Sequence, residues 1–152
     1  MANTYSQLYN HLIFAVKERA PLIPKERREE LHKYITGIIN NNDCNLIAIN
    51  SMPDHIHIFL SMHPKIAISD LVRDIKSNSS IFIKNKDWSK SFAWQEGFGA
   101  FSYSRSQRDD VIRYIRNQDE HHAKKTFRNE YIDFLKAFNI EYDERYIFEE
   151  TK

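Results

Sequence analysis

The chain has 152 residues, of which 41% are hydrophobic and 28% charged, and its formal net charge at pH 7 is +1. No apolar run reaches the roughly 20 residues that a membrane-spanning helix needs, and the charge balance is not that of a strongly basic nucleic-acid-binding protein. The single cysteine, Cys44, excludes an intrachain disulfide and is typical of a reducing compartment. We therefore expect one cytoplasmic domain over residues 1–152, with no membrane partner.

The first half of the chain predicts the order strand, helix, strand, strand, helix. Alternating apolar residues at 9–17 favour a strand, and the apolar spacing within 25–40 favours a helix. Residues 44–51 and 55–62 are apolar and separated by a short turn, so we expect them to form a hairpin. A second helix is predicted to begin near Ser69, whose hydroxyl can cap it.

The second half predicts one more strand and two more helices. Residues 91–104 are aromatic and interrupted by glycine, which favours a strand with a bulge or bend. A helix is predicted over 106–122, with Ser106 and Asp109 at the spacing of a capping box. The last helix is predicted over 127–139, because its apolar residues recur at helical spacing.

The order of these elements is that of the ferredoxin-like α+β fold. A helix connects strands one and two, and another connects strands three and four, which gives two βαβ-like halves. We expect an antiparallel sheet with helices packed on one face, the other face partly open, and extra C-terminal helices.

Two histidines lie inside the apolar strand predicted at 55–62. Because strand side chains alternate, His55 and His57 share one face and Ile56 and Ile58 share the other. The isoleucine face belongs to the core, so the histidines lie on the open face, where two imidazoles can reach one metal ion. Alternatively, both are half-buried polar residues that face solvent.

A tyrosine and a glutamine on the predicted helix 106–122 can complete a site. Tyr114 and Gln118 are four residues apart and share a helical face, with a carbonyl oxygen available to a cation. A phenol with a pKa of about 10 is a poor nucleophile, but a metal that polarises a phosphate helps it. Alternatively, Tyr114 is a packing aromatic beside Val111 and Ile115.

Together these motifs resemble the HUH single-tyrosine transposases of the insertion-sequence-200/605 type. The matching stretches are "MPDHIHIFLS", "WQEGFGAFSYS" and "YIRNQ", and the resemblance covers nearly the whole chain. It implies that His55, His57 and Gln118 bind the metal and that Tyr114 is the nucleophile. In this family the tyrosine attacks single-stranded DNA, retains the 5′ end as a phosphotyrosine and frees a 3′-OH, so strands are rejoined without ATP.

The resemblance also implies the partners and the metal. Family members have a ferredoxin-like fold, form homodimers in which one subunit's tyrosine can serve the other's histidines, and bind imperfect DNA hairpins at element ends. The expected metal is Mg²⁺ or Mn²⁺, and imidazole ligands suit Mn²⁺ better. Zinc is the competitor, since two histidines and an oxygen can also hold it.

Other residues compete for these roles. His121 and His122 follow on the same helix and could supply a metal ligand in place of the glutamine or contact DNA. His11, on the first strand, either lines the site or packs. Tyr103 and Tyr131 are rival nucleophiles, but neither has a glutamine partner.

Phosphates require cations, and the basic residues expected to contact DNA are Arg73, Lys76, Lys84, Arg105, Arg108 and Arg113.

Three other functions stay open. A domesticated relative would process palindromes without moving an element. An initiator nickase would use the same chemistry, although the small size and the absence of a helicase segment disfavour it. A non-catalytic ferredoxin-like nucleic-acid-binding module would not need the tyrosine.

Overall fold

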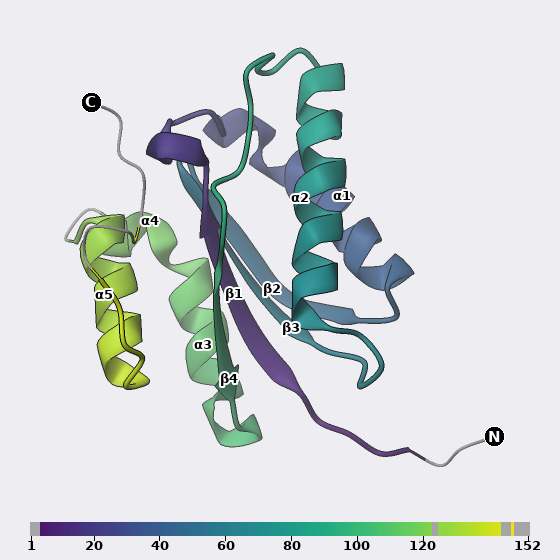
Figure 1. The fold of residues 1–152 in the computed structure, drawn as a ribbon, viewed down its shortest axis with the longest axis vertical. Coiled ribbons are helices and arrows are strands. Elements are labelled where there is room, and N and C mark those ends of the chain that lie inside the picture. Colours follow the sequence, from purple (N-terminus) through teal and green to yellow (C-terminus); the bar gives the residue numbers. More distant parts are fainter. Residues whose placement is uncertain (1–3, 123–124, 144–146, 148–152) are drawn as a thin grey trace.

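The structure, a computed structural model, describes residues 4–122, 125–143 and 147, with the backbone alone for 121 and 122. The elements follow the predicted order (Figure 1). The strands and helices are β1 (Tyr9–Ala15), α1 (Arg28–Asn41), β2 (Asn45–Met52), β3 (His55–Ser61), α2 (Ile68–Asn85), β4 (Gly99–Tyr103), α3 (Arg108–Arg116), α4 (Gln118–His122) and α5 (Phe127–Ala137). Short 3₁₀ turns are η1 (Lys17–Arg19), η2 (Lys25–Arg27) and η3 (Arg105–Gln107).

The four strands form one sheet in the order β2-β3-β1-β4, and every neighbouring pair is antiparallel. The two central strands, β1 and β3, set the register of the histidines, since His57 lies opposite Ile13 and Phe59 lies opposite His11. The predicted α+β fold with a ferredoxin-like antiparallel sheet is therefore confirmed.

One face of the sheet packs against α1 and α2 (Figure 1). Ile56, Ile58 and Leu60 point to this face and pack with Leu31 of α1 and Ile75 of α2. Burying each such side chain contributes about 1.5–3 kcal/mol, so this layer holds β3 in place. No helix among the described residues is long and apolar enough to cross a bilayer.

The opposite face, which carries the histidines, is covered by α3, α4 and α5 (Figure 1). Ile115 of α3 packs with Phe59, and Phe127 of α5 packs with Ile13. The expectation that this face is open was therefore wrong, because the apolar stripes of the C-terminal helices are buried against it. Gly99 of β4 also allows α5 to approach closely, because a Cβ there would lie 2.8 Å from the Tyr131 hydroxyl oxygen.

The predicted fourth strand contains the expected bend. Trp94 pairs with Val16 as an isolated bridge, and the regular strand β4 begins only at Gly99. Gly97 lies between them with a φ of 82°, a conformation that glycine adopts readily. Nζ of Lys76 donates to the backbone carbonyls of residues 95 and 97, at 2.8 and 2.6 Å, and so fixes the bend.

Two predicted helix caps were wrong. The N-cap of α2 is Ala67, which makes no side-chain capping bond, so Ser69 lies inside the helix. The capping box before α3 is formed by Ser104 and Gln107 and not by Ser106 with the aspartate at 109. The 3₁₀ turn η3 explains the shift, since the chain begins to turn before the regular helix starts.

Replacing Ile58 by alanine should lower the free energy of unfolding by about 2–5 kcal/mol, because the lost side chain leaves a cavity in the layer between sheet and helices. Urea unfolding followed by circular dichroism measures the change. Replacing Ile81, which is 55% exposed on α2, should change the free energy by less than about 0.5 kcal/mol. Equal losses in both variants would contradict this core.

Candidate functional site

The two histidines of β3 lie in the middle of the molecule. His55 and His57 are both 0% exposed, and their ring centroids lie 5.1 Å apart in an edge-to-face arrangement. The sheet register places them on the face covered by α5, where Phe127 stacks on the His55 ring with centroids 3.7 Å apart. A strand buried on both faces holds both imidazoles rigidly.

Each imidazole is oriented through its Nδ1 atom. Oδ1 of Asp54 lies 2.7 Å from Nδ1 of His55, and Nε2 of His11 lies 2.8 Å from Nδ1 of His57. Burial lowers the pKa of His11 well below its ordinary value, and the neighbouring His57 lowers it further. With Nδ1 occupied, the Nε2 atoms are the ones available to a metal.

A carboxylate from α5 completes this group. Glu130 is 4% exposed, and its Oε1 lies 3.1 Å from Nε2 of His57. The donor atoms of His55, His57 and Glu130 all lie within 4.8 Å of one another. Two nitrogens and a hard oxygen suit Mn²⁺ well and can also hold Mg²⁺ or zinc, so the donor set fits the expected metal.

The sequence interpretation missed Glu130. The available signal was an acidic residue on the apolar stripe of the last helix, three residues after Phe127 and four before Phe134. A carboxylate at a buried helical position costs free energy unless it is paired, which points to a partner inside the protein.

Tyr114 of α3 lies against the same group. Its ring centroid is 6.0 Å from that of His57, and its hydroxyl forms hydrogen bonds with the side chains of Glu130 and Gln118. Asn50 of β2 donates through Nδ2 to the carbonyl of residue 115 at 2.9 Å, which anchors α3. Burial, followed by the charge of Glu130, raises the pKa of Tyr114 above its usual range, so the phenol is protonated at neutral pH.

Gln118 does not lie on a continuous helix with Tyr114. The helix breaks at Asn117, where α3 ends and α4 begins. Gln118 is nevertheless buried, and its Nε2 donates to the Tyr114 carbonyl at 3.3 Å. The ion pair between Arg28 and Asp119, at 3.1 Å, holds α4 near the start of α1. The structure thus places Gln118 beside the tyrosine, and its service as a metal ligand stays a prediction.

The rival residues have different surroundings. Burial raises the pKa of Tyr103 and of Tyr131 to about 12. Tyr103 borders a cavity of about 270 Å³ that His11 and Tyr114 also line, and Tyr131 packs at the start of β4. The side chains at 121 and 122, the alternative histidine ligands, lie outside the described residues.

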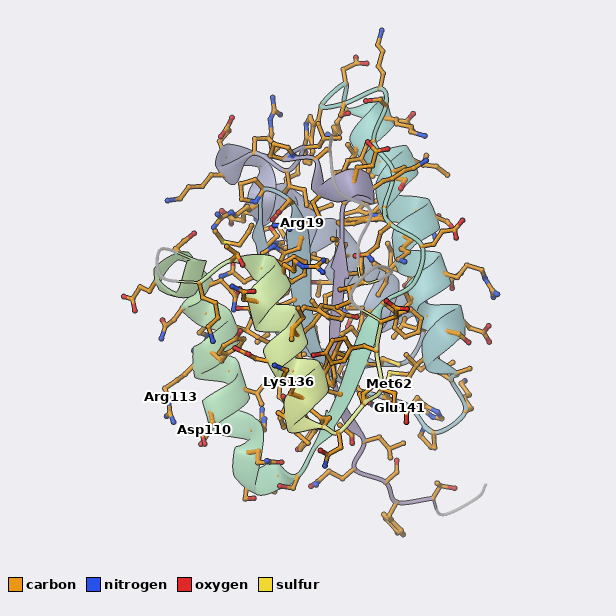
Figure 2. All side chains as sticks on the ribbon, turned by 60° about the vertical axis from the view of Figure 1, so that its left-hand side comes forward. Arg19, Met62, Asp110, Arg113, Lys136 and Glu141 are labelled. Carbon is orange, nitrogen blue, oxygen red and sulfur yellow. The ribbon has the colours of Figure 1, made fainter. Side chains whose placement is uncertain are left out.

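The six basic residues expected to contact DNA divide between the two sides of the sheet. Arg73, Lys76 and Lys84 belong to α2, on the face away from the histidines, and Arg73 forms an ion pair with Asp70 at 3.1 Å. Arg105, Arg108 and Arg113 belong to η3 and α3, on the histidine side. Figure 2 shows Arg113 on the outer side of α3 beside its ion-pair partner Asp110.

The candidate site is closed to a large ligand in this state. His55, His57 and Gln118 are all 0% exposed, and α5 supplies the ring and the carboxylate that cover them. In this state the imidazoles are therefore out of reach of a DNA phosphate.

Replacing Glu130 by glutamine should weaken Mn²⁺ binding by at least about tenfold, because the group loses its only charged oxygen donor. Calorimetric titration of the metal-free protein measures this. The same change at Glu120, an exposed residue of α4, is the matched control and should leave the affinity unchanged. Undiminished binding by the Glu130 variant would exclude the carboxylate as a ligand.

Comparisons with known proteins place this chain in a family. Residues 4–118 match the family model described as Transposase IS200 like. The chain is 31% identical over 121 residues to the ISDra2 transposase TnpA of Deinococcus radiodurans, covering 75% of this chain and 86% of that protein. It is 24% identical over 83 residues to the transposase for insertion sequence element IS200 of Salmonella typhimurium, covering 55% of each.

Two solved structures share the fold. A Deinococcus radiodurans protein described as a transposase has a TM-score of 0.59 and 26% identity, over 78% of this chain and 95% of that chain. A REP-associated tyrosine transposase bound to a REP hairpin also has a TM-score of 0.59, with 16% identity, over 80% of this chain and 73% of that chain. Since the family model covers most of the chain, including both histidines, Tyr114 and Gln118, the chain belongs to the IS200-like transposase family.

Proposed function

We propose that this transposase cleaves and rejoins single-stranded DNA at hairpin ends through a 5′-phosphotyrosine intermediate on Tyr114. The observation that carries the proposal is the phenol of Tyr114 lying against the buried group of His55, His57 and Glu130. Phenol, imidazoles and carboxylate come from three separate elements, and packing alone does not require that combination at one point.

His55 and His57 would hold Mg²⁺ or Mn²⁺, with an oxygen from Glu130 or from Gln118. When bound, the metal would polarise a DNA phosphate and favour attack by a phenol. The same donors accept zinc, so the metal in the cell has to be measured.

The reaction then follows from the chain's own groups. Oη of Tyr114 forms a bond to phosphorus, the bond from phosphorus to the 3′ oxygen breaks, and that oxygen takes up a proton. Glu130 hydrogen-bonds to the phenol and is placed to accept the phenolic proton. The phosphotyrosine retains the energy of the broken bond, so a 3′-OH can attack it later and rejoin the strand.

Hairpin DNA is the proposed substrate because a structurally similar transposase was solved bound to a REP hairpin. Arg105, Arg108 and Arg113 are the proposed phosphate contacts nearest the tyrosine, because η3 and α3 carry them on the histidine side. DNA that wraps around to the other face of the sheet would contact Arg73, Lys76 and Lys84 of α2. Lys76 also holds the bend before β4 through its hydrogen bond to the carbonyl of residue 95.

We further propose that the chain forms a homodimer in the cytoplasm and acts as a single catalytic domain over residues 1–152. Tyr114 lies beside His57 of its own chain, which supports catalysis within one subunit.

A domesticated palindrome-processing relative or an initiator nickase would use the same site, and the DNA flanking the gene distinguishes them. A non-catalytic nucleic-acid-binding module is the alternative of another class.

Replacing Tyr114 by phenylalanine should abolish the covalent adduct and leave hairpin binding intact, because only the attacking oxygen is lost. The assay mixes the protein with labelled single-stranded DNA from its own gene flanks and Mn²⁺, and a band that resists denaturation reports the adduct. Replacing the rival Tyr131 by phenylalanine is the control and should preserve the adduct. An adduct that survives in the Tyr114 variant would refute the assigned nucleophile.

Co-expressing two inactive variants tests which subunit supplies the tyrosine. A mixture of His57→Ala and Tyr114→Phe subunits should form no adduct, because neither chain carries a complete site. If subunits share sites, mixed dimers would regain one intact site and cleave. The control co-expresses each variant with the native chain, which should remain active.

A further inference from the structure

Asn50 of β2 lies directly across the sheet from His57. The two residues oppose each other in the antiparallel pairing of β2 with β3, and directly opposed residues point to the same face of a sheet. This face of β2 is the one against which α3 packs, through Ala48 and Ile115. Asn50 is half-buried there. The sheet register therefore fixes the position of Asn50 relative to the candidate metal group.

Backbone groups hold both ends of the Asn50 amide. Its Oδ1 accepts a hydrogen bond from the backbone N–H of residue 51, and its Nδ2 donates to the carbonyl of residue 115, each at 2.9 Å. A backbone N–H only donates and a carbonyl only accepts, so these two partners also determine which end of the amide carries the hydrogens. A rotation of this side chain would break at least one of the two bonds.

The accepting carbonyl belongs to the last turn of the helix that carries the tyrosine. Carbonyls of a last turn have no partner within their own helix, so a donor from outside can bind them. Residue 115 directly follows Tyr114, and α3 ends at Arg116. A bond at this point constrains both the position of α3 along the sheet and its rotation about its own axis. The direction of the Tyr114 side chain depends on both.

Apolar packing between α3 and the sheet does not fix that placement by itself. Ile115 packs with Ala48 and Phe59, and burial of apolar surface is a non-directional force. A hydrogen bond weakens steeply when its angle departs from linearity. The bond from Asn50 therefore adds the directional contact between this end of α3 and the sheet.

Other links to this segment constrain the phenol less. Arg28 pairs with Asp119 of α4, beyond the break that ends α3, and the Asp119 side chain is 54% exposed. Exposed ion pairs contribute little. The Tyr114 hydroxyl bonds to Glu130 and Gln118, but these bonds are exchanged when the same groups take part in the proposed reaction. A bond to the backbone of residue 115 can persist while the hydroxyl attacks.

We propose that Asn50 is a positioning residue, which holds the nucleophilic Tyr114 at a fixed place relative to His57 of the same chain. The proposal rests on the cleavage function proposed above. It assigns a role to a polar side chain that touches neither the metal donors nor the reacting oxygen, and that acts through the backbone next to the tyrosine.

The first test is the rate of adduct formation at saturating DNA and Mn²⁺. Asn50→Leu keeps the approximate size of the side chain and removes both hydrogen bonds. Its rate should fall about 10- to 100-fold, because a misplacement of about 1 Å has an effect of this order. The DNA concentration that gives half the maximal rate and the Mn²⁺ affinity should stay unchanged. Asn50→Gln keeps an amide donor and should recover part of the rate.

The matched control removes the same kind of bond at another helix end. Asn42 is also half-buried, and its Nδ2 donates to the carbonyl of residue 38 in the last turn of α1, likewise at 2.9 Å. Asn42→Leu should form the adduct at the native rate, and thermal unfolding shows that each variant is folded. If native protein forms no adduct, the proposed function fails. If native and Asn50→Leu proteins form it at equal rates, only the role of Asn50 fails.

The second test locates the phenol without the reaction. Fluorine nuclear magnetic resonance of protein labelled with fluorotyrosine identifies the Tyr114 signal as the one missing from Tyr114→Phe. Bound Mn²⁺ broadens nearby fluorine signals, with diamagnetic Mg²⁺ as the reference. The Tyr114 signal should broaden strongly in the native and Asn42→Leu proteins and less in Asn50→Leu. Equal broadening in all three would overturn the positioning role, whatever the rates.

Discussion

The contact between His57 and Glu130 is the interaction on which the site depends. It joins the central strand β3 to the last described helix, α5, across 73 positions of the sequence. Both side chains are almost fully buried, and buried ionisable groups cost free energy unless they are paired or bind a cation. Three features bring His57 and Glu130 together with Tyr114: the sheet register, the break before α4 and the packing of α5.

The layered architecture also determines access. Helices α1 and α2 fix the sheet from one side, and the C-terminal helices cover the histidines from the other (Figure 1). The family match ends at residue 118, so it includes the histidines and the tyrosine but not α5. The helix beyond the match is the one that supplies the buried carboxylate and the ring stacked on His55. In this structure α5 therefore supplies both the carboxylate of the candidate metal group and the aromatic ring that covers His55.

The sequence predicted the fold because its apolar periodicities are strong and its elements follow a common order. It predicted that the histidines share a face, since strand alternation requires it. It did not predict Glu130 or the support that His11 gives to His57, because both depend on contacts between residues far apart in the chain. Local sequence signals also misplaced two helix caps. The 3₁₀ turn η3 shifts the start of α3, and α2 begins without a capping side chain.

The central claim is that one cation is held by His55, His57 and an oxygen donor beside Tyr114 of the same chain. Anomalous diffraction from crystals grown with Mn²⁺ tests this most directly, because the manganese position is seen independently of the protein atoms. We predict one strong peak within bonding distance of Nε2 of both histidines, with the phenol of the same chain facing it. A peak elsewhere, or histidines that meet only the tyrosine of another subunit, would contradict the account.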